Sequence, residues 1–147
     1  MNLSRPAALA LAAALITLTG CASTGTGPSA TAPAPGAPSP AAVTVDEHAD
    51  RTTVKVAVGT TVTLALHSTY WSAATSSTPD VATPDGTPTT VPSPSCRPGG
   101  GCGTVSTSFT AHAPGTARLT ATRTTCGEAR ECPPEQRSYQ VTVEVTG

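Results

Sequence analysis

The sequence predicts an all-β domain over residues 43–147, arranged as an antiparallel two-sheet sandwich of about seven strands. Apolar and polar residues alternate with a period of two through most of this segment. Valine and threonine dominate the alternating runs, and turns containing glycine or proline separate several of them. Alternation over four to eight residues is typical of strands with one buried face. Several such strands within about a hundred residues favour a sandwich of immunoglobulin-like (Ig-like) architecture.

The runs follow one another along the chain, each with its apolar or small residues on one face. These positions are 43 and 45, then 54, 56 and 58, then 62, 64 and 66, then alternate residues of 105–111, 117–121 and 139–145. Gly59-Thr60 indicates a hairpin turn between the second and third runs. Pro114-Gly115 supplies another turn, because proline fixes φ at the first turn position and glycine tolerates positive φ at the next. No helix is predicted beyond the N-terminal segment.

Residues 72–98 interrupt the alternation. Prolines stand at 79, 84, 88, 92, 94 and 98, and Asp85-Gly86 is typical of a turn. Because proline cannot donate a hydrogen bond to a sheet ladder, we expect a long crossing connection here. At most a short edge strand is predicted near residues 89–91.

Trp71 is the only tryptophan of the chain and the largest apolar side chain available for a core. We expect it to fill the space between the two sheets. The alternative is that Tyr70 and Trp71 form an exposed binding pair. No cysteine of the domain precedes Trp71, so the antibody pattern of two cysteines around a buried tryptophan is absent. The predicted likeness to Ig domains is therefore one of architecture.

Residues 1–20 have the pattern of a secretion signal. Arg5 lies in a short n-region, and residues 6–18 carry no charge. Such a run is too short for a membrane-spanning helix, which needs about 20 apolar residues, but it fits a cleavable signal peptide. The tetrapeptide Leu18-Thr19-Gly20-Cys21 resembles the lipobox of bacterial lipoproteins. The resemblance implies cleavage before Cys21 and a diacylglyceryl group on its sulfur; the alternative is an ordinary signal peptide with Cys21 unmodified.

Residues 21–42 would then comprise the lipidated cysteine and a flexible linker. After Cys21 this segment consists of Ala, Ser, Thr, Gly and Pro without any charge, a composition that favours polyproline II and coil. The expected location of the protein is the extracytoplasmic face of the cell membrane, where the lipid would hold the domain.

Four further cysteines form two Cys-x5-Cys motifs, Cys96 with Cys102 and Cys126 with Cys132. Disulfides persist in exported proteins, and pairing within each motif is the simplest of the three possible connectivities. Pairing between the motifs stays open as an alternative. Structural zinc usually has two to four residues between paired ligands, so neither a metal nor another cofactor is expected.

The composition argues against nucleic-acid binding and against catalysis. The chain has eight Lys and Arg against nine Asp and Glu, with one Trp, two Tyr and one Phe, whereas nucleic-acid binding relies on clustered basic residues. His67 and Ser68 are neighbours near the end of a predicted strand and would point to opposite sides. That arrangement does not suit a catalytic triad, and no catalytic residue is assigned.

Several segments of the domain follow the pattern of a known family. They are Val58-Gly59-Thr60-Thr61-Val62-Thr63-Leu64 before Tyr70-Trp71, Gly100-Gly101-Cys102-Gly103-Thr104, Phe109, Ala113-Pro114-Gly115-Thr116-Ala117, Arg123, and Tyr139-Gln140-Val141-Thr142-Val143. In these segments the domain resembles the chagasin-type inhibitors of papain-like cysteine proteases, which are Ig-like sandwiches.

That family inhibits with three loops at one end of the sandwich, which carry Asn-Pro-Thr-Thr-Gly, a glycine-rich stretch and Arg-Pro-Trp. The first loop corresponds here to residues 67–70, without the Asn-Pro. The second keeps Gly100, Gly103 and Thr104 but has Cys102 at a glycine position, and the third keeps Arg123 before Thr124-Thr125-Cys126. The resemblance implies that residues 67–71 and both Cys-x5-Cys loops lie at the same end.

These observations predict a surface-anchored bacterial lipoprotein whose disulfide-stiffened domain is a non-catalytic binding module. The alternatives are a chagasin-like inhibitor of papain-like cysteine proteases and a structural component of the cell envelope. The expected partners are the membrane, through the lipid, and an extracellular or envelope protein, but no nucleic acid. The candidate binding residues are His67, Ser68, Thr69, Tyr70, Gly100, Gly101, Gly103, Arg123, Glu128 and Arg130.

Overall fold

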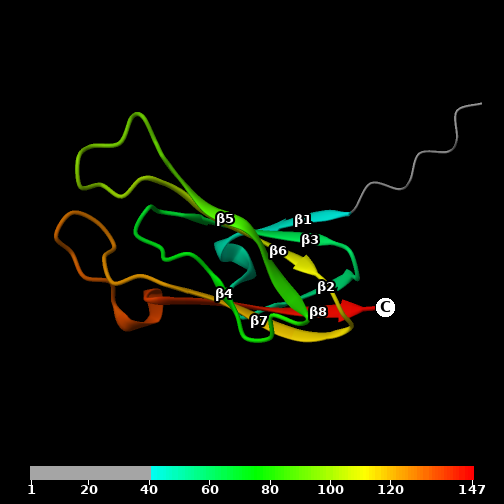
Figure 1. Cartoon of the computed structure of the whole chain (residues 1–147). Coiled ribbons are helices and arrows are strands. Elements are labelled where there is room, and N and C mark those ends of the chain that lie inside the picture. The colour runs from blue at the N-terminus through cyan, green and yellow to red at the C-terminus, as the bar shows by residue number, and fades with distance from the viewer. Residues whose placement is uncertain (1–40) are drawn as a thin grey trace, which may run out of the picture. The chain divides into compact units, whose positions relative to one another are not determined.

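The computed structural model describes residues 41–147, which form two four-stranded sheets packed face to face (Figure 1). The first sheet has the order β1 (Ala42–Val45), β3 (Thr61–His67), β6 (Gly103–Ala111) and β5 (Ala82–Pro92). The second has the order β2 (Thr53–Ala57), β8 (Ser138–Thr146), β7 (Gly115–Thr122) and β4 (Thr75–Ser76). The predicted all-β sandwich is confirmed. The predicted signal peptide, Cys21 and all but the last two residues of the predicted linker lie outside the described residues.

Two short 3-10 helices, η1 (Glu47–Ala49) and η2 (Pro134–Gln136), lie in connections between strands. The first lies between β1 and β2, and the second lies just before β8. Within residues 41–147, no helix has the length and apolar character needed to cross a membrane.

Each sheet contains one parallel pair, so the expectation of purely antiparallel sheets was wrong. β1 runs parallel to β3, with Val43 opposite Val62, and β2 runs parallel to β8, with Val54 opposite Val143. The turn at η1 lets the chain leave the first sheet after β1 and join the second sheet with β2. Alternation reports which face of a strand is buried but not the direction of its neighbour, and this is why the sequence could not reveal the parallel pairs.

The turn at Gly59-Thr60 is not a hairpin, because β2 and β3 belong to different sheets. Gly59 has a φ of +86°, and its N–H donates to the carbonyl of Ala111 at 2.7 Å. The turn therefore carries the chain across the edge of the sandwich. The connection at Pro114-Gly115 does the same between β6 and β7. A turn signal marks a reversal of the chain, but the partner of the next strand is decided by packing.

Residues 72–98 contain β4 and the eleven-residue β5, so the expectation of a long connection with at most a short strand was wrong. β5 is an edge strand with three prolines, and its register with β6 shifts between Asp85 and Thr89. Edge strands and bulges tolerate proline, because one side of the ladder needs no N–H donors. The prolines of this segment thus indicate an edge position.

The core lies between the sheets and is built from most of the apolar positions of the alternating runs. The expectation for Val58 was wrong: it follows the end of β2 and is 44% exposed. Val62, Leu64 and Leu66 of β3 are buried, and they face Phe109, Leu119 and Val141 from other strands of the two sheets. Trp71 is 7% exposed and belongs to the same cluster. The prediction that Trp71 fills the core is therefore confirmed, and the exposed-pair alternative for this residue was wrong.

Candidate functional site

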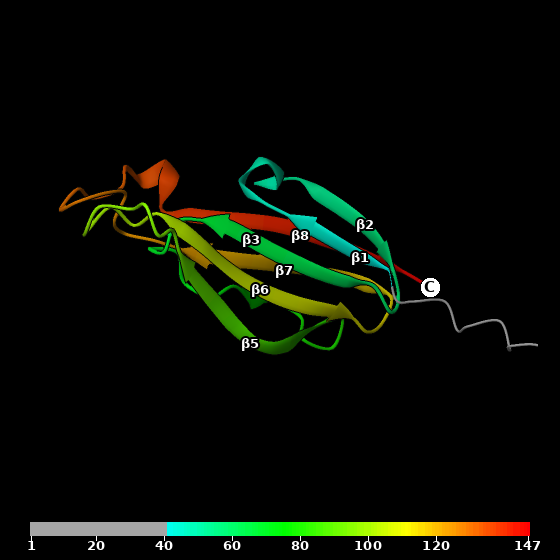
Figure 2. The same ribbon diagram turned by 90° about the horizontal axis from the view of Figure 1, so that it is seen from above.

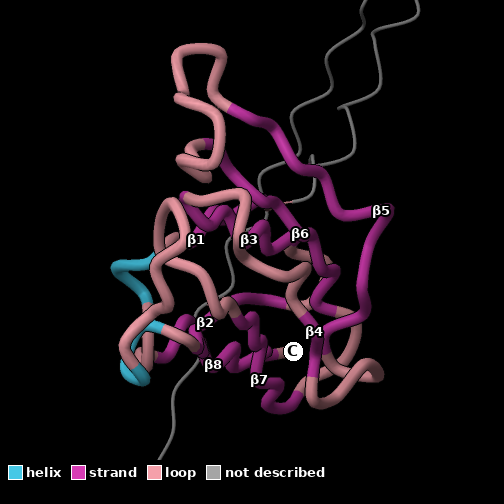
Figure 3. Tube along the Cα trace, turned by 90° about the vertical axis from the view of Figure 1, so that its left-hand side faces the viewer, coloured by secondary structure: helices cyan, strands magenta, loops and turns pink. Residues whose placement is uncertain are grey.

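Three connections meet at one end of the sandwich, which we call the loop end. They are the first loop (residues 68–74), the second loop (93–102) and the third loop (123–137). Figure 1 and Figure 2 show the second and third loops projecting side by side, while the C-terminus lies at the opposite end of the strands. Figure 3 views the sandwich from the loop end. The arrangement agrees with what the family resemblance implied.

The first and second loops are joined by Thr69 and Tyr70. The N–H of Thr69 donates to the carbonyl of Gly101 at 2.8 Å, and the hydroxyl of Tyr70 donates to the carbonyl of Gly99. A Cβ on Gly101 would lie only 2.1 Å from the ring of Tyr70. Glycine at this position therefore makes the close contact between the tyrosine ring and the second loop possible.

The second loop is closed by the Cys96–Cys102 disulfide, with a Cα–Cα distance of 5.6 Å. Its turns are held by backbone hydrogen bonds from Cys96 to Ser93 and from Gly100 to Arg97. The loop is largely exposed at its glycines. The second loop therefore contains a short covalent ring in which three consecutive glycines follow the exposed residues Arg97 and Pro98.

The third loop contains the Cys126–Cys132 disulfide, so the structure confirms the local pairing in both motifs. Thr125 and Glu131, the residues that directly precede the two cysteines, form an isolated antiparallel bridge. Cys132 is 1% exposed, and Arg137 Nε donates to its carbonyl at 2.7 Å. The third loop thus contains a small disulfide-closed hairpin in which Cys126 is half-buried and Cys132 is buried.

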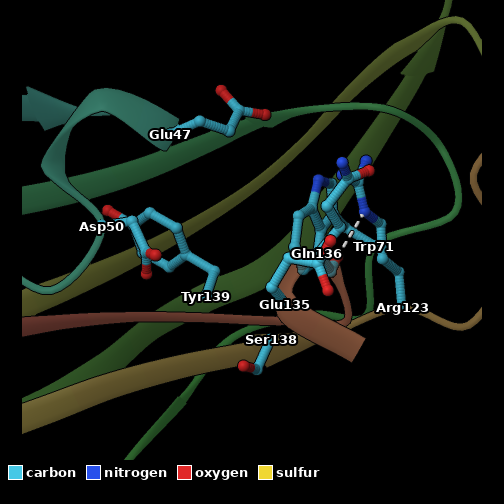
Figure 4. Close-up of a pocket in the computed structure, with 8 residues that line it drawn as sticks. All are labelled: Glu47, Asp50, Trp71, Arg123, Glu135, Gln136, Ser138 and Tyr139. Atoms are coloured by element: carbon cyan, nitrogen blue, oxygen red, sulfur yellow. Dashed lines mark hydrogen bonds between the residues drawn. The ribbon is translucent and has the colours of Figure 1, made fainter. Parts of the chain in front are cut away.

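Arg123 links the third loop to the core. Its guanidinium carbon lies 4.3 Å from the centroid of the Trp71 ring, and its Nε donates to the carbonyl of Gln136 at 3.0 Å. Figure 4 shows Arg123 and Gln136 beside Trp71, with Glu47 and Asp50 farther along the same pocket. This pocket has a volume of about 140 Å³. A guanidinium over an indole ring is held by a cation–π attraction, which fixes the start of the third loop.

A larger cavity of about 540 Å³ opens between the loops. Six of the predicted binding residues line this cavity, namely His67, Ser68, Gly100, Gly101, Gly103 and Arg123. The other lining residues are Ser93, Cys102, Thr104 and Cys126. Thr69 and Tyr70 support the second loop through the contacts described above. Glu128 lies over Gly99, where a Cβ would be 3.5 Å from Glu128 Cγ. Arg130 is exposed in the third loop and is not among the residues that line this cavity. The binding role of these residues stays a prediction.

Glu47 contacts a predicted binding residue, His67, although the sequence did not assign Glu47 to the candidate site. The side chain of Asp46 caps η1 by accepting from the N–H of His48, and the hydroxyl of Tyr139 donates to the Asp46 carbonyl at 2.9 Å. Glu47, thus positioned, lies with Oε2 2.8 Å from His67 Nδ1 and also accepts from the His67 backbone N–H. Hydrogen bonding to this carboxylate, and its negative charge, raise the pKa of His67 above the ordinary value.

Replacing Glu47 by Gln is expected to lower the pKa of His67 toward about 6.5, the value for an unperturbed histidine. The interaction of Glu47 with protonated His67 stabilises the folded domain. This stabilisation is fully present below about pH 6.5, the pKa of histidine in the unfolded chain, and it is lost as the pH rises through the folded-state pKa of His67. An NMR titration of the His67 ring measures the pKa of His67 in the unchanged protein and in Glu47→Gln. Glu144→Gln is the control, because Glu144 pairs with Lys55 on the second sheet. An unchanged His67 pKa in Glu47→Gln would contradict the assigned contact.

No family model matches the chain, and no curated protein does. Several solved structures match the chain, including the two that follow. The cysteine protease inhibitor EhICP2 from Entamoeba histolytica has 14% sequence identity to this chain and a TM-score of 0.53. The match covers 72% of this chain and 96% of the EhICP2 chain. The solution structure of Amebosin has 17% identity and a TM-score of 0.49, covering 74% of this chain and 100% of its own. The fold defines the chain as an Ig-like sandwich similar to that of EhICP2, and at this identity the likeness concerns the fold.

Proposed function

We propose that the domain binds and inhibits papain-like cysteine proteases through its loop end. The observation that carries the proposal is the meeting of three separate connections around one open cavity, with hydrogen bonds between the first two. Because loops ordered before association lose less conformational freedom on binding, such a surface favours affinity. The two disulfides add to this order, since each closes a short ring within one of the loops.

The glycines of the second loop suit insertion into a partner's cleft. Gly99 and Gly100 are exposed, and Gly101 is half-buried against Tyr70. Because these three glycines have no side chains, their backbone could approach a protease surface closely and offer its peptide groups as hydrogen-bond partners. The similar fold of EhICP2, a cysteine protease inhibitor, supports this choice of partner over an unspecified envelope protein.

We also propose that Cys21 carries a lipid anchor at the extracytoplasmic face of a bacterial membrane. The carbonyl of Ala41 accepts from the N–H of Thr61, and β2 ends beside Thr146 near the C-terminus. A tether joined to Ala41 would thus attach at the end of the strands opposite the loop end. Intact-mass spectrometry of the native protein tests the anchor: a chain that starts at Cys21 and carries acyl groups is expected, and an unmodified Cys21 would contradict it.

The inhibitor proposal is tested by titrating the oxidised protein against papain and following hydrolysis of a peptide substrate. We expect inhibition at micromolar protein or below, reversible on dilution, because the proposed contact is non-covalent. Absence of inhibition at micromolar concentration would contradict the proposal. Binding to papain without any inhibition would also contradict it, while leaving the loop end as a surface for another protein.

Two matched double variants test whether the loop end makes the contact. Glu128→Ala with Arg130→Ala removes one acid and one base from the third loop, and is expected to weaken inhibition. Lys55→Ala with Glu144→Ala removes an exposed ion pair of 3.4 Å from the second sheet, and is expected to leave inhibition unchanged. Equal effects of the two double variants would contradict the assignment of the third loop.

A further inference from the structure

The Cys96–Cys102 disulfide is placed where an external molecule can reach it. Cys102 lines the cavity between the loops, and the residue is exposed. A Cβ on Gly100 would lie 2.8 Å from Cys96 Sγ and 3.3 Å from Cys102 Sγ. Glycine at position 100 therefore spares the two sulfurs the methyl group or larger side chain that any other residue would press against them.

Cys96 Sγ has a hydrogen-bond donor directed at it. The backbone N–H of Cys102 points to this sulfur, with an N–S distance of 3.1 Å. A donor in this position stabilises negative charge on the sulfur more than it stabilises the neutral disulfide. In thiol–disulfide exchange the leaving sulfur departs as a thiolate, and a stabilised thiolate leaves faster. The ring therefore has an exposed cysteine, Cys102, in the lining of the cavity and a supported leaving group at Cys96.

The second disulfide is less exposed and has a different leaving group. Cys126 also lines the cavity, but attack on its sulfur would expel the thiolate of Cys132. That residue is 1% exposed, so the new charge would form out of contact with water, where an unpaired charge is strongly unfavourable. Attack on Cys132 itself would require an approach through the packed interior. The two disulfides thus differ in access and in leaving group, although they share the same loop spacing.

We propose that Cys96–Cys102 is a reactive disulfide that exchanges with external thiolates, whereas Cys126–Cys132 is a structural one. The thiolate attacks Cys102 Sγ and forms a mixed disulfide with it, while the Cys96–Cys102 bond breaks and its electron pair leaves on Cys96 Sγ. No oxidant or reductant beyond the attacking thiol is needed. The class of reactant is a small thiol or a protein cysteine thiolate, and the step does not depend on the inhibitor proposal.

Opening of this ring is expected to be local. Thr69 N–H to Gly101 and Tyr70 hydroxyl to Gly99 still hold the second loop after the covalent bond is broken. The core between the sheets contains neither cysteine of this ring. The exchanged protein should therefore keep the circular dichroism spectrum of the oxidised form, with a changed second loop.

The test is a time course of the fully oxidised protein with reduced glutathione, stopped by acid and alkylation and mapped by peptide mass spectrometry. We expect Cys96–Cys102 to open several-fold faster than Cys126–Cys132, with glutathione on Cys102 and the alkyl group on Cys96. Equal rates, faster opening of Cys126–Cys132, or glutathione found on Cys96 alone would overturn the proposal.

Gly100→Ala supplies a second measurement on a protein with all four cysteines. The φ of Gly100 is not in the positive region, so the backbone dihedrals allow alanine. Its Cβ would lie 2.8 Å from Cys96 Sγ and 3.0 Å from the Arg97 carbonyl oxygen, so the ring must shift to hold the methyl group against the sulfurs. The variant is expected to exchange more slowly at Cys96–Cys102 and at the original rate at Cys126–Cys132. An unchanged exchange rate at Cys96–Cys102 would contradict the role given to the missing side chain at Gly100.

Discussion

Gly101→Ala is expected to separate the first and second loops and to weaken protease inhibition by about tenfold or more, or about 1.4 kcal/mol of binding free energy. The new Cβ would lie 2.1 Å from the Tyr70 ring, a distance that two carbon atoms do not adopt. The ring or the second loop must therefore move. The hydrogen bond from Thr69 N–H to Gly101 is lost with that movement, and hydrogen exchange of the Thr69 amide should accelerate.

Gly86→Ala is the matched control for this variant. Gly101 has a φ of +65° and Gly86 a φ of +72°, so alanine meets a similar backbone penalty of about 1–2 kcal/mol at both positions. A Cβ on Gly86 has no atom within 4 Å, and the residue lies in the irregular part of β5. Equal losses of inhibition in the two variants would show that backbone conformation, and not the Tyr70 contact, explains the effect of Gly101→Ala.

Phe109→Ala is expected to destabilise the domain by about 3–5 kcal/mol. Phe109 is 0% exposed and lies on β6 between Val62 on β3 and Pro84 on β5. The truncation removes buried apolar surface and leaves a cavity that the two sheets can close only in part. For a domain of this size, Tm should fall by about 4–8 °C for each kcal/mol lost. Thermal denaturation with both disulfides intact measures the change.

Val91→Ala is the control for the loss of an apolar side chain. Val91 lies on β5 in the same sheet and is 64% exposed. Substitutions at such positions usually change stability by no more than about 0.5 kcal/mol. If the two variants had similar Tm values, the core position of Phe109 would be wrong.

The features that the sequence predicted correctly depend on neighbours along the chain. The period of two placed Val62, Leu64 and Leu66 on one face of a strand, and that face is buried. The two Cys-x5-Cys spacings favoured local disulfides, and the paired Cα atoms are 5.6 and 4.8 Å apart. Such patterns are set within one strand or one loop, so they can be read without the rest of the fold.

The errors concern the choice of strand partners. The prolines of β5 limited the predicted edge strand to residues 89–91, whereas the strand spans Ala82–Pro92 at the edge of its sheet, where one row of N–H groups is unused. The Gly59 turn indicated a hairpin, although the next strand joins the other sheet. In both cases the local signal was physically sound, and the packing of distant strands determined its meaning.

The candidate site shows the same division. The resemblance brought residues 67–71 and both cysteine loops to one end, but it did not predict the contacts that order them. Glu47 meets His67 across 20 positions of sequence, Tyr70 reaches Gly99 across 29, and Arg123 lies over Trp71. These contacts require the register of several strands to be established first.

The sequence by itself thus determined the β class and the buried face of most alternating runs, and it favoured the two short disulfide rings, because period and spacing are properties of a continuous segment. Tertiary structure alone decided which strands lie parallel, that the edge strand of the proline-rich segment extends over Ala82–Pro92, and which loop residues meet around the cavity. Those features depend on hydrogen bonds and packing between segments far apart in the chain, and they exist only after the two sheets have closed on their common core.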